Sequence, residues 1–91
     1  MPTLREKAEY VGLCLAMGLF DASEVIAWAD SQIVEADTPP IELIDVSLAA
    51  KRSNYDVLKL LREIPGSGDF VSAAHRALGL LRYRIQKVRP A

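Results

Sequence analysis

The chain has one histidine, His75, and one cysteine, Cys14, the two side chain types best suited to metal binding and nucleophilic chemistry. They lie far apart in the sequence, and neither has a second His or Cys at a metal-ligand spacing. Cys14 lies in the apolar stretch GLCLAM with no charged residue within four positions, so nothing nearby lowers its pKa. We expect Cys14 to be a small buried hydrophobic residue and His75 to be half-exposed on a helix, and we predict no metal and no cofactor.

Carboxylates offer a second kind of chemistry, general acid–base catalysis. Glu24, Ser31 and Glu35 fall on one side of a predicted helix, with Trp28 between them. Catalysis by such a pair requires a buried carboxyl with a shifted pKa, whereas an acidic helix face is usually only solvated. The GSG sequence at 66–68 lacks the lysine and the preceding strand of a phosphate-binding loop. We therefore predict no catalytic residues and a protein that is not an enzyme.

Helix start and stop signals recur along the chain. Thr3 with Glu6, and Asp21 with Glu24, have the spacing of a capping box, and Gly18 is a typical helix stop. The predicted helices cover residues 3–17, 22–36, 39–51, 54–64 and 70–88. No segment alternates with the period of a strand, and 91 residues suffice for one core. The sequence predicts an all-α fold, a compact five-helix bundle that forms a single domain over residues 1–91.

The last helix carries the strongest apolar pattern. Six residues recur at spacings of three and four, as in a heptad repeat: Val71, Ala74, Leu78, Leu81, Ile85 and Val88. We expect this seam to pack across its own bundle and, with helices 3–17 and 39–51, to supply most of the core. A homodimer through the last helix is the alternative. Helix 39–51 has two apolar stripes on nearly opposite sides, so we expect it at the centre of the bundle or under a second chain.

Charge is segregated along the sequence. No Lys or Arg occurs from Ala8 to Ala50, and the formal charge is −5 over residues 1–64 and +4 over residues 65–91. Exposed ion pairs contribute only about 0–1 kcal/mol each, which is too little to explain this segregation as a stabilising device. We predict a non-catalytic protein-interaction module, an adaptor or an inhibitor/immunity-like protein of small bacterial type, with a basic protein partner. The predicted partner-binding residues are Glu24, Trp28, Glu35, Asp37, Glu42 and Asp45.

The basic end supplies a second predicted surface. Arg76, Leu80, Tyr83 and Lys87 fall within about 60° of one another on a helical wheel. Cations near the end of a helix also interact favourably with its dipole, so a solvated face is the alternative interpretation.

Residues 43–62 form two short predicted helices joined by a turn. This segment resembles the helix-turn-helix of lac-repressor-like regulators at these positions: Leu43, Asp45, Val46, Ser47, Ala50, Ser53 and Val57. The resemblance implies that Ser53, Asn54 and Tyr55 open a recognition helix, with Lys59 and Arg62 near phosphates. Nucleic-acid binding through this segment and the basic last helix is therefore the alternative function, although the charge of residues 1–64 opposes it.

The apolar stretch at residues 10–20 raises the question of a secretion signal or a membrane span. Glu6 and Glu9 precede it, where a signal peptide normally lacks acids, and no small-residue cleavage site follows. It is also shorter than the ~20 apolar residues of a spanning helix. We predict a cytoplasmic protein that does not interact with membranes.

Overall fold

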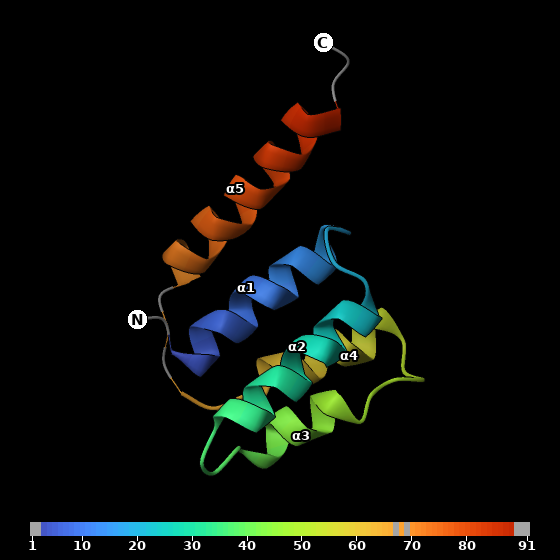
Figure 1. Cartoon of the computed structure of the whole chain (residues 1–91), viewed down its shortest axis with the longest axis vertical. Helices are drawn as coiled ribbons and strands as arrows, with labels where there is room; N and C mark the ends of the chain where they lie inside the picture. Colours follow the sequence, from blue (N-terminus) through green and yellow to red (C-terminus); the bar gives the residue numbers. More distant parts are fainter. Residues whose placement is uncertain (1–2, 67, 69, 89–91) are drawn as a thin grey trace.

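The computed structural model describes residues 3–66, 68 and 70–88, apart from the side chain of Val88. This part of the chain contains no strand and five helices: α1 (Leu4–Ala16), α2 (Ala22–Glu35), α3 (Ile41–Ser47), α4 (Asn54–Arg62) and α5 (Phe70–Val88). The predicted all-α, five-helix fold is confirmed. None of these helices combines the length and the apolarity needed to cross a bilayer. Figure 1 shows α1 between α5 on one side and α2 and α4 on the other, with α3 at the far edge.

The predicted helix starts form as local hydrogen bonds. At α2, Asp21 Oδ1 accepts the Glu24 N–H at 2.8 Å while Glu24 Oε1 accepts the Asp21 N–H at 3.1 Å, a complete capping box. The side-chain oxygens of Thr3 and Ser53 accept the backbone N–H groups of Glu6 and Asp56 at 3.1 and 3.2 Å. These bonds satisfy donors that the first helical turn leaves unpaired.

Gly18 ends α1 as the sequence predicts. Its φ of 76° is accessible to glycine at little cost. The turn lets the Leu19 N–H bond to Cys14 O at 2.8 Å and the Gly18 N–H bond to Leu15 O at 3.1 Å, the two bonds of a Schellman motif. The chain thereby reverses direction and brings α2 back along α1.

Helix α3 is shorter than predicted at both ends. The expected start at residue 39, capped by Thr38, is wrong, because α3 begins at Ile41 after Pro40, with no side-chain cap. A residue that precedes proline is disfavoured in the helical region, and Pro39 precedes Pro40. At the other end the Ala49 N–H bonds to Val46 O at 3.1 Å in a tight turn, which buries Ala49.

The main core is formed by α1, α2, α3 and α4. Its buried residues are Ala8, Val11, Leu15, Val25, Ala29, Leu43, Val46, Ala49, Val57, Leu61 and Ile64. The central helix is α1, which contacts α2, α4 and α5. The expectation that the third helix lies at the centre is wrong: α3 buries Leu43 and Val46 but exposes Ile41 and Leu48.

The predicted core seam of α5 is wrong for three of its positions, whereas Leu81 is half-buried against the cluster of Cys14, Leu19 and Ala77. Helix α5 meets α1 through the buried Ala73 and Ala77, about a quarter turn away from the seam. Val71, Leu78 and Ile85 are 60%, 55% and 51% exposed. Because the side chains of Ala73 and Ala77 are small, α5 can approach α1 closely at these positions. The apolar face of α5 is wide, and α1 covers only part of it. The Val88 side chain, the sixth position of the seam, lies outside the described residues.

Candidate protein-interaction surfaces

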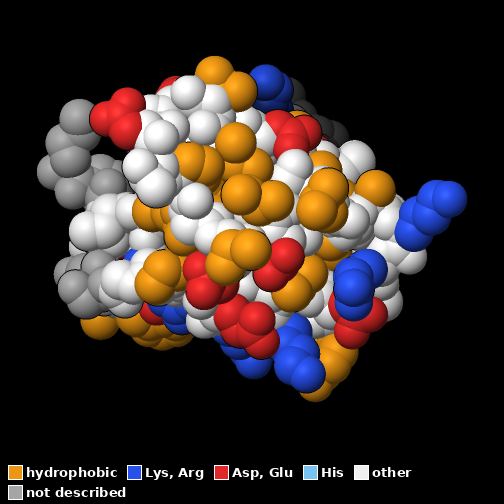
Figure 2. Space-filling model, turned by 90° about the horizontal axis from the view of Figure 1, so that it is seen from below, with side chains coloured by type: hydrophobic (Ala, Val, Ile, Leu, Met, Phe, Trp, Pro, Cys, Tyr) orange, Lys and Arg blue, Asp and Glu red, His pale blue; other side chains and the backbone are white. Residues whose placement is uncertain are grey.

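Helices α2 and α3 form a hairpin whose outer side is apolar and acidic. Ser47 Oγ donates a hydrogen bond to Asp30 Oδ1, which joins the two helices. Val34, Ile41 and Leu48 are 85%, 68% and 76% exposed. The view from the α3 side shows apolar side chains gathered in the middle of the face, with carboxylates beside them and Lys or Arg side chains at the lower and right margins (Figure 2). We define the α2–α3 outer surface as Val34, Ile41 and Leu48 with the exposed carboxylates of Asp37 and Asp45.

The carboxylates of this surface form no ion pair with the Lys and Arg side chains that the structure describes. Among the described residues, the salt bridge present joins Arg5 to Glu9 within α1, at 3.3 Å. Helix α5 packs against α1, where Arg84 donates to Leu19 O and lies 5.9 Å from the Phe20 ring centre. The basic end of the sequence is therefore held away from the acidic hairpin.

Two predicted site residues, Glu24 and Trp28, lie in a groove of about 500 Å³ between α1, α2 and α5. Trp28 is half-buried and packs against the main core, while one carboxylate oxygen of Glu24 caps α2. Lys7 and Arg76 also line this groove, and the Arg76 guanidinium lies 4.7 Å from the Tyr10 ring centre. With two cations and one carboxylate, the groove is not an acidic site.

The other four predicted acids lie outside this groove. Glu35, Asp37 and Asp45 are exposed, and Glu42 is half-buried. The structure therefore brings Glu24 and Trp28 together with Arg76 of the second predicted surface, and leaves the remaining acids near the α2–α3 hairpin. Sequence reasoning missed the exposed apolar residues of the α2–α3 outer surface. The two apolar stripes of residues 39–51 indicated that Ile41 and Leu48 could be exposed, whereas no pattern in the sequence indicated this for Val34.

The second predicted surface is largely used within the chain. Arg76 covers Tyr10, and Leu80 packs against a small cluster that contains Cys14 and Ala77. Tyr83 is 56% exposed, and Lys87 Nζ lies 3.4 Å from its hydroxyl group and 5.5 Å from its ring centre. Tyr83 and Lys87 are therefore the outward part of this strip.

The candidates for chemistry lie apart from one another. Cys14 is fully buried, as expected, and burial raises the pKa of its thiol, so the thiolate is disfavoured. His75 is exposed on α5. Within the described part of the chain, no three His, Cys, Asp or Glu residues are grouped to hold a metal ion. The absence of enzymatic activity stays a prediction.

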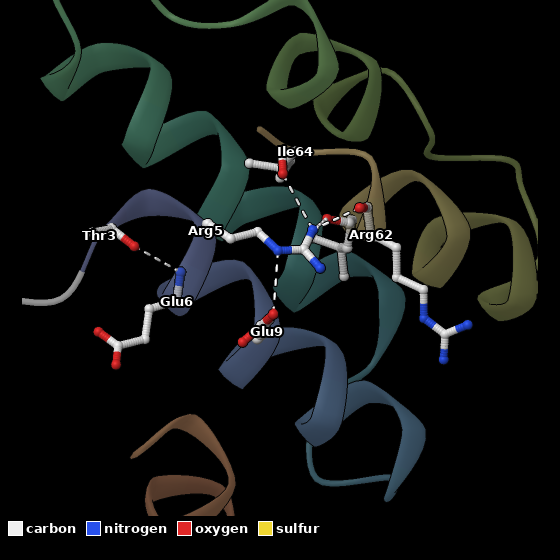
Figure 3. Close-up of polar contacts among 7 residues, drawn as sticks. Thr3, Arg5, Glu6, Glu9, Arg62 and Ile64 are labelled. Atoms are coloured by element: carbon white, nitrogen blue, oxygen red, sulfur yellow. Dashed lines mark hydrogen bonds and ion pairs between the residues drawn. The ribbon is translucent and has the colours of Figure 1, made fainter. Parts of the chain in front are cut away.

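Arg5 links α1 to the end of α4. Its spacing of four residues from Glu9 predicts an ion pair within α1, a signal that the sequence analysis missed. Its Nη1 atom donates to the carbonyl oxygens of Leu61, Arg62 and Ile64 at 3.3, 2.6 and 3.2 Å, and its Nε donates to Glu9 Oε1 (Figure 3). These carbonyls belong to the C-terminal end of α4, where unpaired acceptors need partners. Arg5 therefore fixes α4 against α1 and has a structural role.

The segment that resembles a helix-turn-helix comprises α3, the turn after it and α4. Comparison with known proteins gives no match to this segment or to any other part: no family model, no curated protein and no solved structure is similar to the chain.

Proposed function

We propose that the chain is a non-catalytic protein-interaction module that presents the α2–α3 outer surface to a partner with cationic and apolar side chains. An adaptor or an inhibitor/immunity-like protein fits this role. The observation that carries the proposal is the presence of unpaired carboxylates beside three strongly exposed apolar side chains. We propose the cytoplasm as its location, because a lone buried free thiol is typical of a reducing compartment.

The chemistry of this surface suits protein recognition. Buried apolar anchors supply most of the affinity of protein interfaces, and complementary charges supply specificity and fast association. Single exposed apolar residues are common, but several on one face bordered by charges are typical of an interaction site. Because α5 lies on the other side of α1, its cations do not neutralise the carboxylates of this face.

Charge reversal at Asp45 tests the proposal. We expect Asp45→Lys and Leu48→Asp each to weaken partner binding at least about tenfold without changing the fold, because both side chains are exposed. Partners captured by the wild-type chain from a lysate of its own organism would be identified, purified and titrated against each variant. The control is Glu63→Lys, the same charge change at the exposed end of α4. Unchanged affinity in both variants, or an equal loss in the control, contradicts the proposal.

Nucleic-acid binding is the second candidate. The favouring observation is that Lys51, Arg52, Asn54 and Tyr55 are all exposed around the start of α4, with Tyr55 at 74%. If this surface operates, duplex DNA should bind at low salt, lose affinity as salt rises, and be released by the double change Lys51→Glu, Arg52→Glu. Fluorescence anisotropy measures this, with neutralised Arg76 and Lys87 as a test of the last helix. No binding at low salt removes this candidate.

A further inference from the structure

Helix α5 carries an apolar row with three strongly exposed side chains. We define the α5 row as Val71, Ala74, Leu78, Leu81 and Ile85. Three of its members are more than half exposed, and Ala74 and Leu81 are half-buried. Figure 1 shows α5 at the edge of the molecule, with α1 as its neighbouring helix. The contact with α1 uses Ala73 and Ala77, and Leu81 packs against the small cluster that contains Ala77, so Val71, Leu78 and Ile85 are the outward part of the row.

We propose that the α5 row is the interface of a homodimer in which two copies of α5 pair along their length. The row uses residues other than those of the α2–α3 outer surface, so this proposal stands apart from the proposed function.

The pattern of the row fits a second copy of itself. Val71, Leu78 and Ile85 recur every seven residues, with Ala74 and Leu81 at the intermediate positions, which is the pattern of helices that pair along their length. The row spans about 21 Å from Val71 to Ile85, roughly four helical turns. A parallel pair in register sets each member of the row against its own copy, and an antiparallel pair centred on Leu78 sets Val71 against Ile85 and Leu78 against Leu78. In both orientations apolar side chains meet at the exposed positions of the row.

Arg82 lies at one margin of the row. It is exposed and lies about 20° from Val71 on the helical wheel. A two-fold axis parallel to the helices places the two Arg82 side chains on opposite margins of the interface, and a perpendicular axis at Leu78 separates them by about 12 Å along the helix axes, beyond the Debye length of about 8 Å at physiological salt. Neither orientation of the pair therefore brings these like charges into contact.

The apolar surface also extends from α5 onto its neighbours. Phe70 is 57% exposed and lines a groove of about 260 Å³ between α1 and α4, together with Leu13 and Leu58. Phe70 also opens α5, one residue before the row begins. A second copy that covers the row therefore has further apolar surface available at its margin, as stable homodimers do.

The mass of the protein in solution tests the dimer. We expect sedimentation and light scattering to give twice the 10.0 kDa chain mass for the wild type at micromolar concentrations. Leu78→Glu places two carboxylates at the two-fold axis, so we expect the dissociation constant to rise at least about a hundredfold and the monomer to dominate. Circular dichroism should show a retained fold, because Leu78 is 55% exposed. Leu48→Glu on α3 is the matched control and should stay dimeric.

Disulfide trapping tests the interface separately and determines its orientation. Val71→Cys and Ile85→Cys variants, made with Cys14→Ala and distinguished by a tag, would be mixed and oxidised. Disulfides within each variant indicate a parallel pair, disulfides between the two variants indicate an antiparallel pair, and either result supports the interface. The absence of disulfides in every combination overturns it. A wild-type chain that stays monomeric throughout, or a Leu78→Glu variant that stays dimeric, overturns the interface.

Discussion

Replacing Leu43 by alanine is expected to lower the free energy of unfolding by about 2–5 kcal/mol. Leu43 is fully buried and is one of the largest side chains in the main core. It also holds α3 in place, because this helix has seven residues and no side-chain cap at its start. A chain of this size has roughly 5–15 kcal/mol of stability in total, so the loss should be a large fraction of it.

Leu48→Ala is the matched control for this prediction. It makes the same change on the same helix at a side chain that is 76% exposed, so we expect a change within about 0.5 kcal/mol. Denaturant unfolding followed by circular dichroism gives both values. Equal effects of the two changes would contradict the orientation of α3. The α2–α3 outer surface would lose its basis as well, since the same rotation of α3 buries Leu43 and exposes Ile41 and Leu48.

The helix ends were predictable wherever they depend on a few neighbouring residues. Asp21 and Glu24 form the capping box that their spacing predicts, and Gly18 ends α1 because only a positive φ closes that turn readily. At α3 the same reasoning failed. The sequence offered Thr38 as a cap with proline after it, but the second proline, Pro40, kept Pro39 out of the helical region and moved the start to Ile41.

The packing of α5 could not be read from periodicity. Spacing shows which side chains share a face, but a wide apolar face leaves open which part of it a neighbour covers. Large residues at Leu78 and Ile85 favoured the seam as the core contact, whereas α1 in fact packs against Ala73 and Ala77. Close approach of the helices over small residues outweighed the burial of larger ones. This is a tertiary effect with no local signal in the sequence.

The predicted site was limited by a similar lack of tertiary information. The sequence shows that carboxylates dominate residues 21–45, but not that Glu24 caps its own helix and shares a groove with Arg76. Nor does it show that Val34 stands exposed on α2. Charge segregation along the chain was visible in advance. Where the negative and positive charges lie on the folded surface could not be predicted, because that depends on which side of α2 faces α1.

The second large effect is expected at Arg5, where replacement by methionine should cost about 2–3 kcal/mol of stability. Hydrogen bonds that involve a charged group contribute about 1.5–3 kcal/mol, and the guanidinium contacts three carbonyl oxygens at the end of α4. Its charge also suits the negative end of that helix. Methionine keeps most of the apolar stem, so the change mainly removes the guanidinium. The change also removes the ion-pair partner of Glu9 Oε1. The other carboxylate oxygen, Oε2, is buried without a hydrogen bond among the described residues even when Arg5 is present.

Two further variants separate the contributions at this position. Arg62→Met makes the same chemical change at an exposed side chain of the same helix end, and should change stability by less than about 0.5 kcal/mol. Glu9→Gln removes the ion pair and keeps the carbonyl contacts of Arg5, so its effect should be smaller than that of Arg5→Met. Denaturant midpoints for the three variants decide the matter. If Arg5→Met resembles Arg62→Met, the carbonyl contacts contribute little and α4 is held mainly by apolar side chains such as Val57 and Leu61. If instead Glu9→Gln matches Arg5→Met, the ion pair is the source of the stabilisation, and the link between α1 and α4 is secondary.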